Sequence, residues 1–410
     1  MTMATTAESL SVPSYVPHDR VVHFDIYNPA PDGGDVTNAW KALRDVSKPI
    51  MWTTANGGHW LTTNGEMLRA VLRNHKTFSS AIIMAPREAG GLSDLLPITA
   101  DPPRHLPLRA LLNEALSPRA IQKIEAELRV YARELIEGFK DKGECDFMAD
   151  FGRHFPIGAF FRLAHLPMED YAQLADWMAT IFHHGHSDGS VSQEDIMNRF
   201  ADYLRPIIAA RRDNPGDDLI SAVASGKING EPVDSEIAIK ICRTLVLAGL
   251  DTVMALMSFT MHYLAGDPEL QQRLANNPGD VPRAVDEFGR RFPIGINMRV
   301  LTSDIELDGV TLQADDLIAT PIILHALDET EYADPERIDI DRESGGHTSF
   351  GAGIHRCAGT FLARAEMRVM LEEWLKAIPR FSLRPDAEIK VSVGFTTAIF
   401  QLPLRWDVAS

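Results

Sequence analysis

The chain has 410 residues, a formal net charge of −17 and an apolar share of 45%. This charge argues against general nucleic-acid binding, and no apolar run approaches the roughly 20 residues of a membrane span. The three cysteines, Cys145, Cys242 and Cys357, are far apart and form no CxxC pair, which argues against a disulfide framework. The first residues lack the basic and apolar regions of a signal peptide, so we expect a soluble cytoplasmic protein.

No linker, repeat or shift in composition divides the chain. We therefore expect one domain over residues 1–410, with residues 1–20 as a flexible N-terminus. We also expect the protein to be a monomer that binds neither nucleic acid nor a membrane.

The first half alternates helices with one hairpin. Trp52, the turn pair Gly57-Gly58 and Trp60 indicate a β-hairpin over residues 50–62. Residues 79–103 are apolar and proline-rich without clear periodicity, and a long loop of this kind is often functional. Helical periodicity predicts helices over 36–46, 64–74, 104–140 with a break at Ser117-Pro118, 151–165, 168–182 and 192–213.

The second half begins with the longest predicted helix, which Asp234 can cap and which runs to about Gly266. A shorter helix follows over 279–291, then a strand- and turn-rich stretch over 294–345. A strong helical pattern covers 358–378, and the tail over 380–406 alternates as strands do. The fold class is therefore mainly α with a small β region.

A glycine-rich stretch surrounds the last cysteine and reads Phe350-Gly351-Ala352-Gly353-Ile354-His355-Arg356-Cys357-Ala358-Gly359. Glycines allow tight turns and close backbone approach, and the start of a helix favours a thiolate. Such a sulfur can be a nucleophile, a redox sensor or a metal ligand. A lone Gly-x-Gly would indicate only a turn beside a buried cysteine, but here the pattern is much longer.

The full pattern resembles the haem-binding loop of the cytochromes P-450, and the resemblance covers essentially the whole chain. It implies the P-450 fold, a triangular helical prism around haem b. Cys357 would be the axial thiolate of the iron, and His355 would pair with a haem propionate. Phe350 would pack beside the sulfur, and Gly359 would let the next helix come close to the ring.

A second motif, Ala248-Gly249-Leu250-Asp251-Thr252, lies in the middle of the longest predicted helix. Glycine inside a helix costs roughly 1 kcal/mol relative to alanine, so it usually has a packing or functional reason. Close helix packing is the alternative. The motif resembles the family's oxygen-binding groove, where the Thr252 hydroxyl would bond the carbonyl one turn back or a ligand. Asp251 would deliver protons beside it.

Two basic positions, His105 and Arg109, are four residues apart and share a helix face. A solvated polar face would explain them equally well in isolation. The resemblance implies that both bind haem propionates, with Arg299 as a further propionate partner.

A third motif, Glu287-Phe288-Gly289-Arg290, brings an acid and a base to one helix face. A surface ion pair is the ordinary reading. The motif resembles the family's buried Glu-x-x-Arg, and the resemblance implies a structural triad of Glu287, Arg290 and Arg337.

Further stretches, such as Phe24-Asp25-Ile26-Tyr27-Asn28-Pro29 and Pro86-Arg87-Glu88-Ala89-Gly90, look like the bacterial camphor 5-monooxygenase subfamily. This resemblance implies a [2Fe–2S] ferredoxin as electron donor, reduced by a flavin-containing NADH ferredoxin reductase. The ferredoxin would dock on a basic patch, whose positions are matched by Arg69, Lys76, Arg109 and Arg364.

The predicted substrate pocket is mostly apolar but differs from that of the camphor enzyme, because Ser93 replaces a tyrosine. Room is gained at Gly295 and lost at Phe395, which favours a flatter, longer ring compound. A histidine-rich stretch contains His183, His184 and His186. One of these histidines would bind Asp251, or they would form a metal site, or the stretch is a solvated loop. The predicted lining is Met84, Ser93, Thr244, Leu247, Ala248, Gly295, Phe395 and Thr396.

The resemblance thus implies a haem-thiolate monooxygenase that uses O₂ and ferredoxin-delivered electrons. Its substrate would be a small apolar cyclic compound, a terpenoid or a norisoprenoid such as an ionone. The alternatives are a haem-based sensor or carrier without turnover, a peroxygenase, and a camphor hydroxylase proper.

Overall fold

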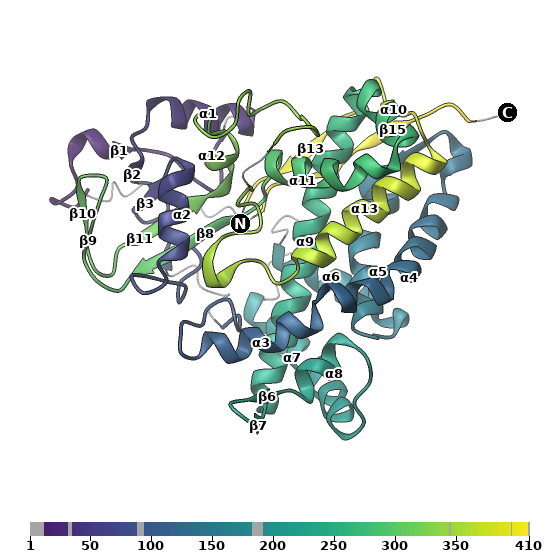
Figure 1. Cartoon of the computed structure of the whole chain (residues 1–410), viewed down its shortest axis with the longest axis horizontal. Coiled ribbons are helices and arrows are strands. Elements are labelled where there is room, and N and C mark those ends of the chain that lie inside the picture. Colours follow the sequence, from purple (N-terminus) through teal and green to yellow (C-terminus); the bar gives the residue numbers. More distant parts are fainter. Residues whose placement is uncertain are drawn as a thin grey trace.

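The computed structural model describes residues 12–31, 35–87, 94–182, 192–343, 346–394 and 396–408, with the backbone alone at 178–182 and 250. Helices dominate, and most strands gather on one side (Figure 1). This is the predicted class, mainly α with a small β region. The helices are α1 (Val36–Val46), α2 (Gly65–Arg73), α3 (His105–Ala115), α4 (Pro118–Glu137), α5 (His154–Leu163), α6 (Tyr171–Phe182), α7 (Gln193–Asp213), α8 (Leu219–Ala224), α9 (Ser235–Gly266), α10 (Pro268–Asn276), α11 (Val281–Arg291), α12 (Ile322–Ala326) and α13 (Thr360–Ala377).

Side-chain caps set several helix starts where the sequence predicts them. The Asn64 side chain accepts from the Met67 backbone N–H at 2.9 Å, and Asp234 accepts from Glu236 at 2.9 Å. The predicted break before α4 lies at Ser117, whose side chain accepts from Ala120, while Pro118 takes the first helical position. Proline is tolerated there because its missing N–H would have no partner in the helix.

The largest sheet has the strand order β1-β2-β3-β11-β8-β4. Its β2–β3 hairpin is the one predicted for residues 50–62, with Trp52 opposite Trp60. The strands are β1 (Val21–Val22), β2 (Ile50–Thr53), β3 (His59–Thr62), β4 (Phe78–Ser79), β5 (Glu144–Asp146), β6 (Lys227–Ile228), β7 (Glu231–Pro232), β8 (Ile296–Leu301), β9 (Ile305–Leu307), β10 (Val310–Leu312), β11 (Leu317–Pro321), β12 (Ser382–Leu383), β13 (Lys390–Ser392), β14 (Ala398–Gln401) and β15 (Pro403–Arg405).

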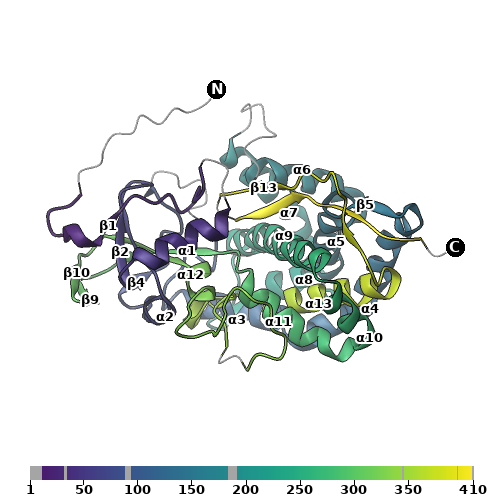
Figure 2. The same ribbon diagram turned by 90° about the horizontal axis from the view of Figure 1, so that it is seen from above.

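Helix α9 passes through the middle of the helical part (Figure 2). It packs against α5, α7, α8, α10, α13 and the C-terminal strand β14. By length and composition α9 could cross a membrane, but 71% of its most apolar stretch is buried inside the protein. Its apolar character is therefore that of a core helix, in contact with protein on most sides.

Part of the N-terminal segment expected to be flexible is packed against the sheet region. Val16 is buried, and the Tyr15 hydroxyl donates to Asp316 Oδ1 at 2.6 Å. Arg20 donates to the Ile50 carbonyl at 3.1 Å and forms an ion pair with Asp308. Residues 12–20 thus have defined contacts.

Several short elements were not predicted, among them α12 and β5 as well as α8, the β6–β7 hairpin and α10. Helix α10 begins directly after α9, where Asp267 caps it by accepting from Leu270 at 2.9 Å. The others contain so few residues that hydrophobic periodicity cannot develop, so the sequence pattern alone reads as a connection.

Candidate functional site

The glycine-rich loop before α13 is held closely against α2. The Cys357 N–H donates to the Phe350 carbonyl at 2.8 Å, which closes the loop. Gly353 has φ +71°, and a Cβ there would collide with the Leu72 carbonyl. Only glycine combines this backbone angle with so close an approach, so the sequence pattern has a direct steric cause.

Cys357 has an accessible surface although protein surrounds it densely. Burial is accordingly the main influence on its thiol and raises its pKa, while a hydrogen bond from the Gly359 backbone and the nearby Arg109 charge lower it. Burial raises the pKa of Cys242 to about 12 and that of Cys145 further still. Cys357 is therefore the cysteine with both access and groups that favour a thiolate.

Four basic side chains gather beside this loop. The rings of His105 and His355 lie 4.2 Å apart between centroids. Burial is the main cause that lowers the pKa of each group, to about 3 for His355 and to about 10 for Arg299, and it lowers those of His105 and Arg109 as well. Among the described residues, neither ring nitrogen of His105 has a hydrogen-bond partner. Asp101 is a carboxylate beside this cluster, with its Oδ1 4.0 Å from His355 Nε2, so the basic groups outnumber the acid.

The small residues in the middle of α9 leave part of the helix surface exposed. Ala248 is exposed, while its neighbour Leu247 is buried. Thr252 lies one turn on and donates its hydroxyl to the Ala248 carbonyl at 3.0 Å. This is the back-bonded arrangement predicted from the sequence, in which the hydroxyl can also turn outward.

Asp251 is buried beside this exposed stretch. Burial raises the pKa of its carboxyl, and a hydrogen bond from the Thr396 hydroxyl lowers it. Thr396 was predicted as part of the substrate lining, and its bond to Asp251 Oδ2 was not anticipated. The candidate partners His183, His184 and His186 lie outside the described residues.

Comparisons with known proteins identify the family. The family model "Cytochrome P450" matches residues 281–402. A curated relative from Sinorhizobium fredii, described as "Probable cytochrome P450 127A1", is 31% identical over 96% of this chain and 97% of its own length. The chain belongs to the cytochrome P450 family.

Other relatives place this cytochrome P450 more closely. The crystal structures of CYP101J2 and CYP101C1 each match with 36% identity and a TM-score of 0.90, over 97% of this chain and 100% of theirs. The erythromycin C-12 hydroxylase of Saccharopolyspora erythraea is 32% identical over 81% of this chain and 85% of its own. The chain is therefore a bacterial-type cytochrome P450 monooxygenase that resembles the CYP101 proteins.

The cofactor of this cytochrome P450 is haem b with a cysteine thiolate ligand. Cys357 is the only cysteine of the sequence within the range that the family model matches. The cluster of His105, His355, Arg299 and Arg109 fits the two propionates, because carboxylates would accept from its donors and neutralise its charge. Cys357 and the four basic side chains thus fit haem b.

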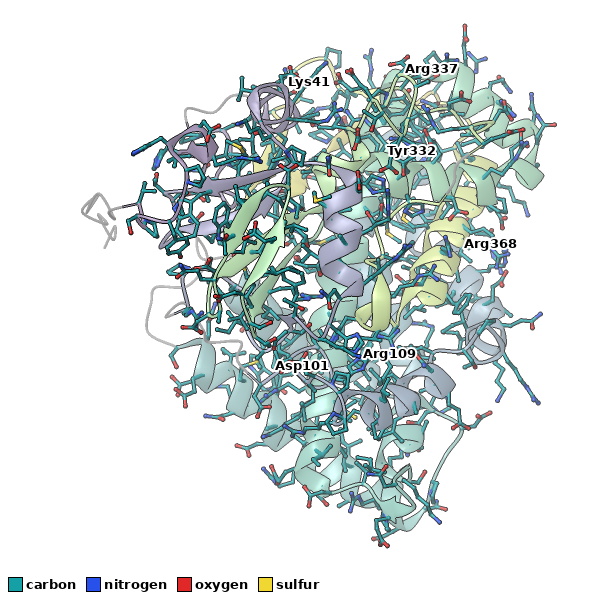
Figure 3. All side chains as sticks on the ribbon, turned by 60° about the vertical axis from the view of Figure 1, so that its left-hand side comes forward. Lys41, Asp101, Arg109, Tyr332, Arg337 and Arg368 are labelled. Carbon is teal, nitrogen blue, oxygen red and sulfur yellow. The ribbon has the colours of Figure 1, made fainter. Side chains whose placement is uncertain are left out.

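The predicted triad needs one correction. Arg290 donates to both carboxylate oxygens of Glu287, at 2.8 and 2.9 Å. The third partner is Arg342, whose Nε donates to Glu287 Oε1 at 3.2 Å, and not Arg337. The Arg337 side chain is exposed at the edge of the molecule (Figure 3) and offers only its carbonyl, to Arg290 and Arg342.

The predicted docking residues differ in how free their charges are. Arg69 makes two hydrogen bonds of 2.7 Å to Glu331, and Arg364 donates to Asp286 at 2.8 Å. Lys76 is exposed, and half-buried Arg109 lies near Cys357 of the haem-binding loop. Two exposed residues that the sequence analysis missed, Arg73 and Arg356, flank the contact between α2 and this loop.

The described part of the predicted pocket is mostly apolar. Leu247 is buried and Met84 half-buried in the main core, and Gly295 approaches Ile322. The Thr244 hydroxyl is satisfied by the Lys240 carbonyl at 2.9 Å. Ser93 and Phe395 lie outside the described residues, so their predicted roles remain predictions.

Proposed function

We propose that this cytochrome P450 hydroxylates a small apolar cyclic substrate, a terpenoid or a norisoprenoid such as an ionone. The observation that carries this is the exposed stretch in the middle of α9, where exposed Ala248 and back-bonded Thr252 lie beside buried Asp251. An exposed helix surface with the Thr252 hydroxyl and the Asp251 carboxyl beside it suits oxygen activation with a controlled supply of protons. A haem-based sensor or carrier would have no need of this pair.

In this proposal each residue has a defined task. Cys357 would ligate the haem iron, with Phe350 and Gly359 around it, and His105, Arg109, Arg299 and His355 would hold the propionates. Bound haem supplies the activation of O₂. Thr252 and Asp251 hold and pass protons, which the buried position of Asp251 protects from bulk water.

The pocket chemistry supports an apolar substrate that is held by shape. Thr244 donates to the Lys240 carbonyl at 2.9 Å, so a ketone would have to compete with that carbonyl for the hydroxyl. Loss of one such bond weakens binding by roughly 0.5–1.5 kcal/mol, and the larger effect is on orientation. A flatter ring compound depends less on a single polar contact than a compact bicyclic one.

The electron donor in this proposal is a [2Fe–2S] ferredoxin, itself reduced by a flavin-containing NADH reductase. Exposed Lys76 and half-buried Arg109 near the haem-binding loop, together with exposed Arg73 and Arg356, support an acidic partner on this face. Arg69 and Arg364 contribute less charge, because acids neutralise them. We further propose a cytoplasmic monomer.

The test is a titration of the haem-loaded protein with ionone and camphor, followed by turnover with a ferredoxin, its reductase and NADH. We expect ionone to shift the haem to high spin more completely and to give an oxygenated product. Full conversion by camphor with one clean product would assign a camphor hydroxylase. Binding without NADH-dependent oxygen consumption would assign a sensor or carrier.

A further inference from the structure

The C-terminal strand β14 and the turn before it are fixed to α9 at two points. At one, the Thr396 hydroxyl donates to Asp251 Oδ2. At the other, the Ile399 N–H donates to Ser258 Oγ at 3.1 Å, and the Ser258 hydroxyl donates onward to the Ala255 carbonyl at 2.7 Å. Both points are on the long helix that carries the oxygen-activation motif.

The two spacings match. Asp251 and Ser258 are seven residues apart, which is nearly two helical turns and a rise of about 10.5 Å on one helix face. Thr396 lies in the bend before β14 (Ala398–Gln401), three residues from Ile399, an interval over which a fully extended chain spans at most about 10 Å. Because both contacts lie on one face of α9, the buried bond between Ile399 and Ser258 limits where Thr396 can contact the helix. The contact with Asp251 therefore follows from the register of β14 on α9.

We propose that Thr396 is a positioning residue for Asp251: its hydroxyl orients the carboxylate beside Thr252 for proton transfer. This inference rests on the proposed monooxygenase function. Thr396 is one of several influences, since Asp251 has at least one interaction beyond this bond. Removing the Thr396 hydroxyl should therefore make the orientation of the Asp251 carboxylate less well defined without losing it completely.

The electrostatics agree with this role. Burial acts on Asp251 first and raises its pKa, and the Thr396 hydroxyl opposes that shift because it donates to the charged form. On the neighbouring helix α13 the buried acid Glu366 has its pKa raised by burial alone, so the two carboxyls do not influence each other. Without the Thr396 hydroxyl, Asp251 should become protonated at a higher pH.

The experiment compares Thr396→Val, which keeps the shape and removes the donor, with Thr396→Ser, which restores a donor. Both are also made with Asp251→Asn. At saturating substrate and reduced ferredoxin we expect Thr396→Val to lower product formation about three- to tenfold at neutral pH. The acid limb of its pH profile should move up by roughly one pH unit. Thr396→Ser should stay within about twofold of the parent.

A readout apart from turnover is the infrared C=O band of protonated Asp251, identified by its loss in Asp251→Asn. In the ferric protein this band should persist to higher pH in Thr396→Val, while the substrate-induced spin shift keeps its midpoint. A changed midpoint with an unchanged band would make Thr396 a substrate contact and overturn the proposal.

The double variant decides whether Thr396 acts through Asp251. In the Asp251→Asn background we expect Thr396→Val to have no further effect on rate or pH profile. Additive losses would overturn the proposal. If the parent protein itself shows no reductant-dependent oxygen consumption, the monooxygenase function fails, and the infrared comparison still tests the Thr396–Asp251 contact.

Discussion

At the scale of single residues, Glu366 shows how burial alone controls an acid. It lies on α13 with 1% of its surface exposed, and burial raises the pKa of its carboxyl well above the usual value of 4.5. Its Oε2 has no hydrogen-bond partner among the described residues. Burial therefore favours the neutral form of this carboxyl in the folded protein.

Glu366→Gln should make the stability of the haem-loaded protein less dependent on pH. The folded state binds the Glu366 proton more tightly than the unfolded state, so the free energy of unfolding falls as pH rises above about 4.5. We expect the Tm of the parent to decline more steeply than that of the variant as the pH rises above about 4.5. Parallel Tm curves would show that Glu366 ionises equally in both states.

Thr252→Ala should separate oxygen consumption from product formation. The variant loses the hydroxyl that donates to the Ala248 carbonyl at 3.0 Å, and the apolar contacts of the substrate remain. We expect substrate binding and NADH consumption to continue, while product per NADH falls about tenfold or more and hydrogen peroxide accumulates. Thr252→Ser is the control that retains a hydroxyl. Equal product per NADH in Thr252→Ala and the parent would remove Thr252 from proton transfer.

At the scale of elements, one buried carboxylate joins α11 to the segment before the haem-binding loop. Glu287 binds Arg290 within α11, accepts from Arg342 at 3.2 Å and accepts from the Asp339 N–H at 3.0 Å. Arg342 also donates to the Asp334 and Arg337 carbonyls, each at 3.1 Å. Arg342 thus stabilises the loop that leads to Cys357.

Arg342→Ala should destabilise the protein, and Arg337→Ala should not. Removing Arg342 takes one charged hydrogen bond from a buried carboxylate, a loss of about 1.5–3 kcal/mol. We expect a lower Tm and weaker haem retention in Arg342→Ala, measured by thermal unfolding and by the haem absorbance per protein. Greater damage from Arg337→Ala would contradict the observed triad.

At the scale of the whole molecule, a net charge of −17 repels an acidic partner, so the basic side chains near the haem-binding loop must direct its approach. Lys76 follows α2 and is exposed, whereas Lys390 is exposed on β13, a strand that lies apart from α2 (Figure 2). A ferredoxin that docks near α2 would interact electrostatically with Lys76 and not with Lys390.

Lys76→Glu should raise the KM for the ferredoxin several-fold at low salt, with kcat little changed. The difference from the parent should shrink above about 0.15 M salt, because screening shortens the range of the charge. Lys390→Glu alters net charge equally and is the matched control. Equal effects of both substitutions would point to net charge and not to a docking site near α2.

Local features of the sequence predicted most of the elements. The caps at Asn64, Ser117 and Asp234 set helix starts, and long apolar periodicity set the extent of α9. Helices as short as α8 were not predicted, because six residues are too few to show hydrophobic periodicity. Capping and periodicity are properties of neighbouring residues, so they can be recognised without a fold.

What the sequence by itself determined is the family, the mainly α class and the Cys357 loop, since each depends on residues close together in the chain. The tertiary structure alone decided that Arg342 completes the triad, that acids neutralise Arg69 and Arg364, and that Thr396 bonds Asp251. Residues 251 and 396 are 145 positions apart. Their contact depends on the register of a strand on a helix, which only the packing of the whole chain determines.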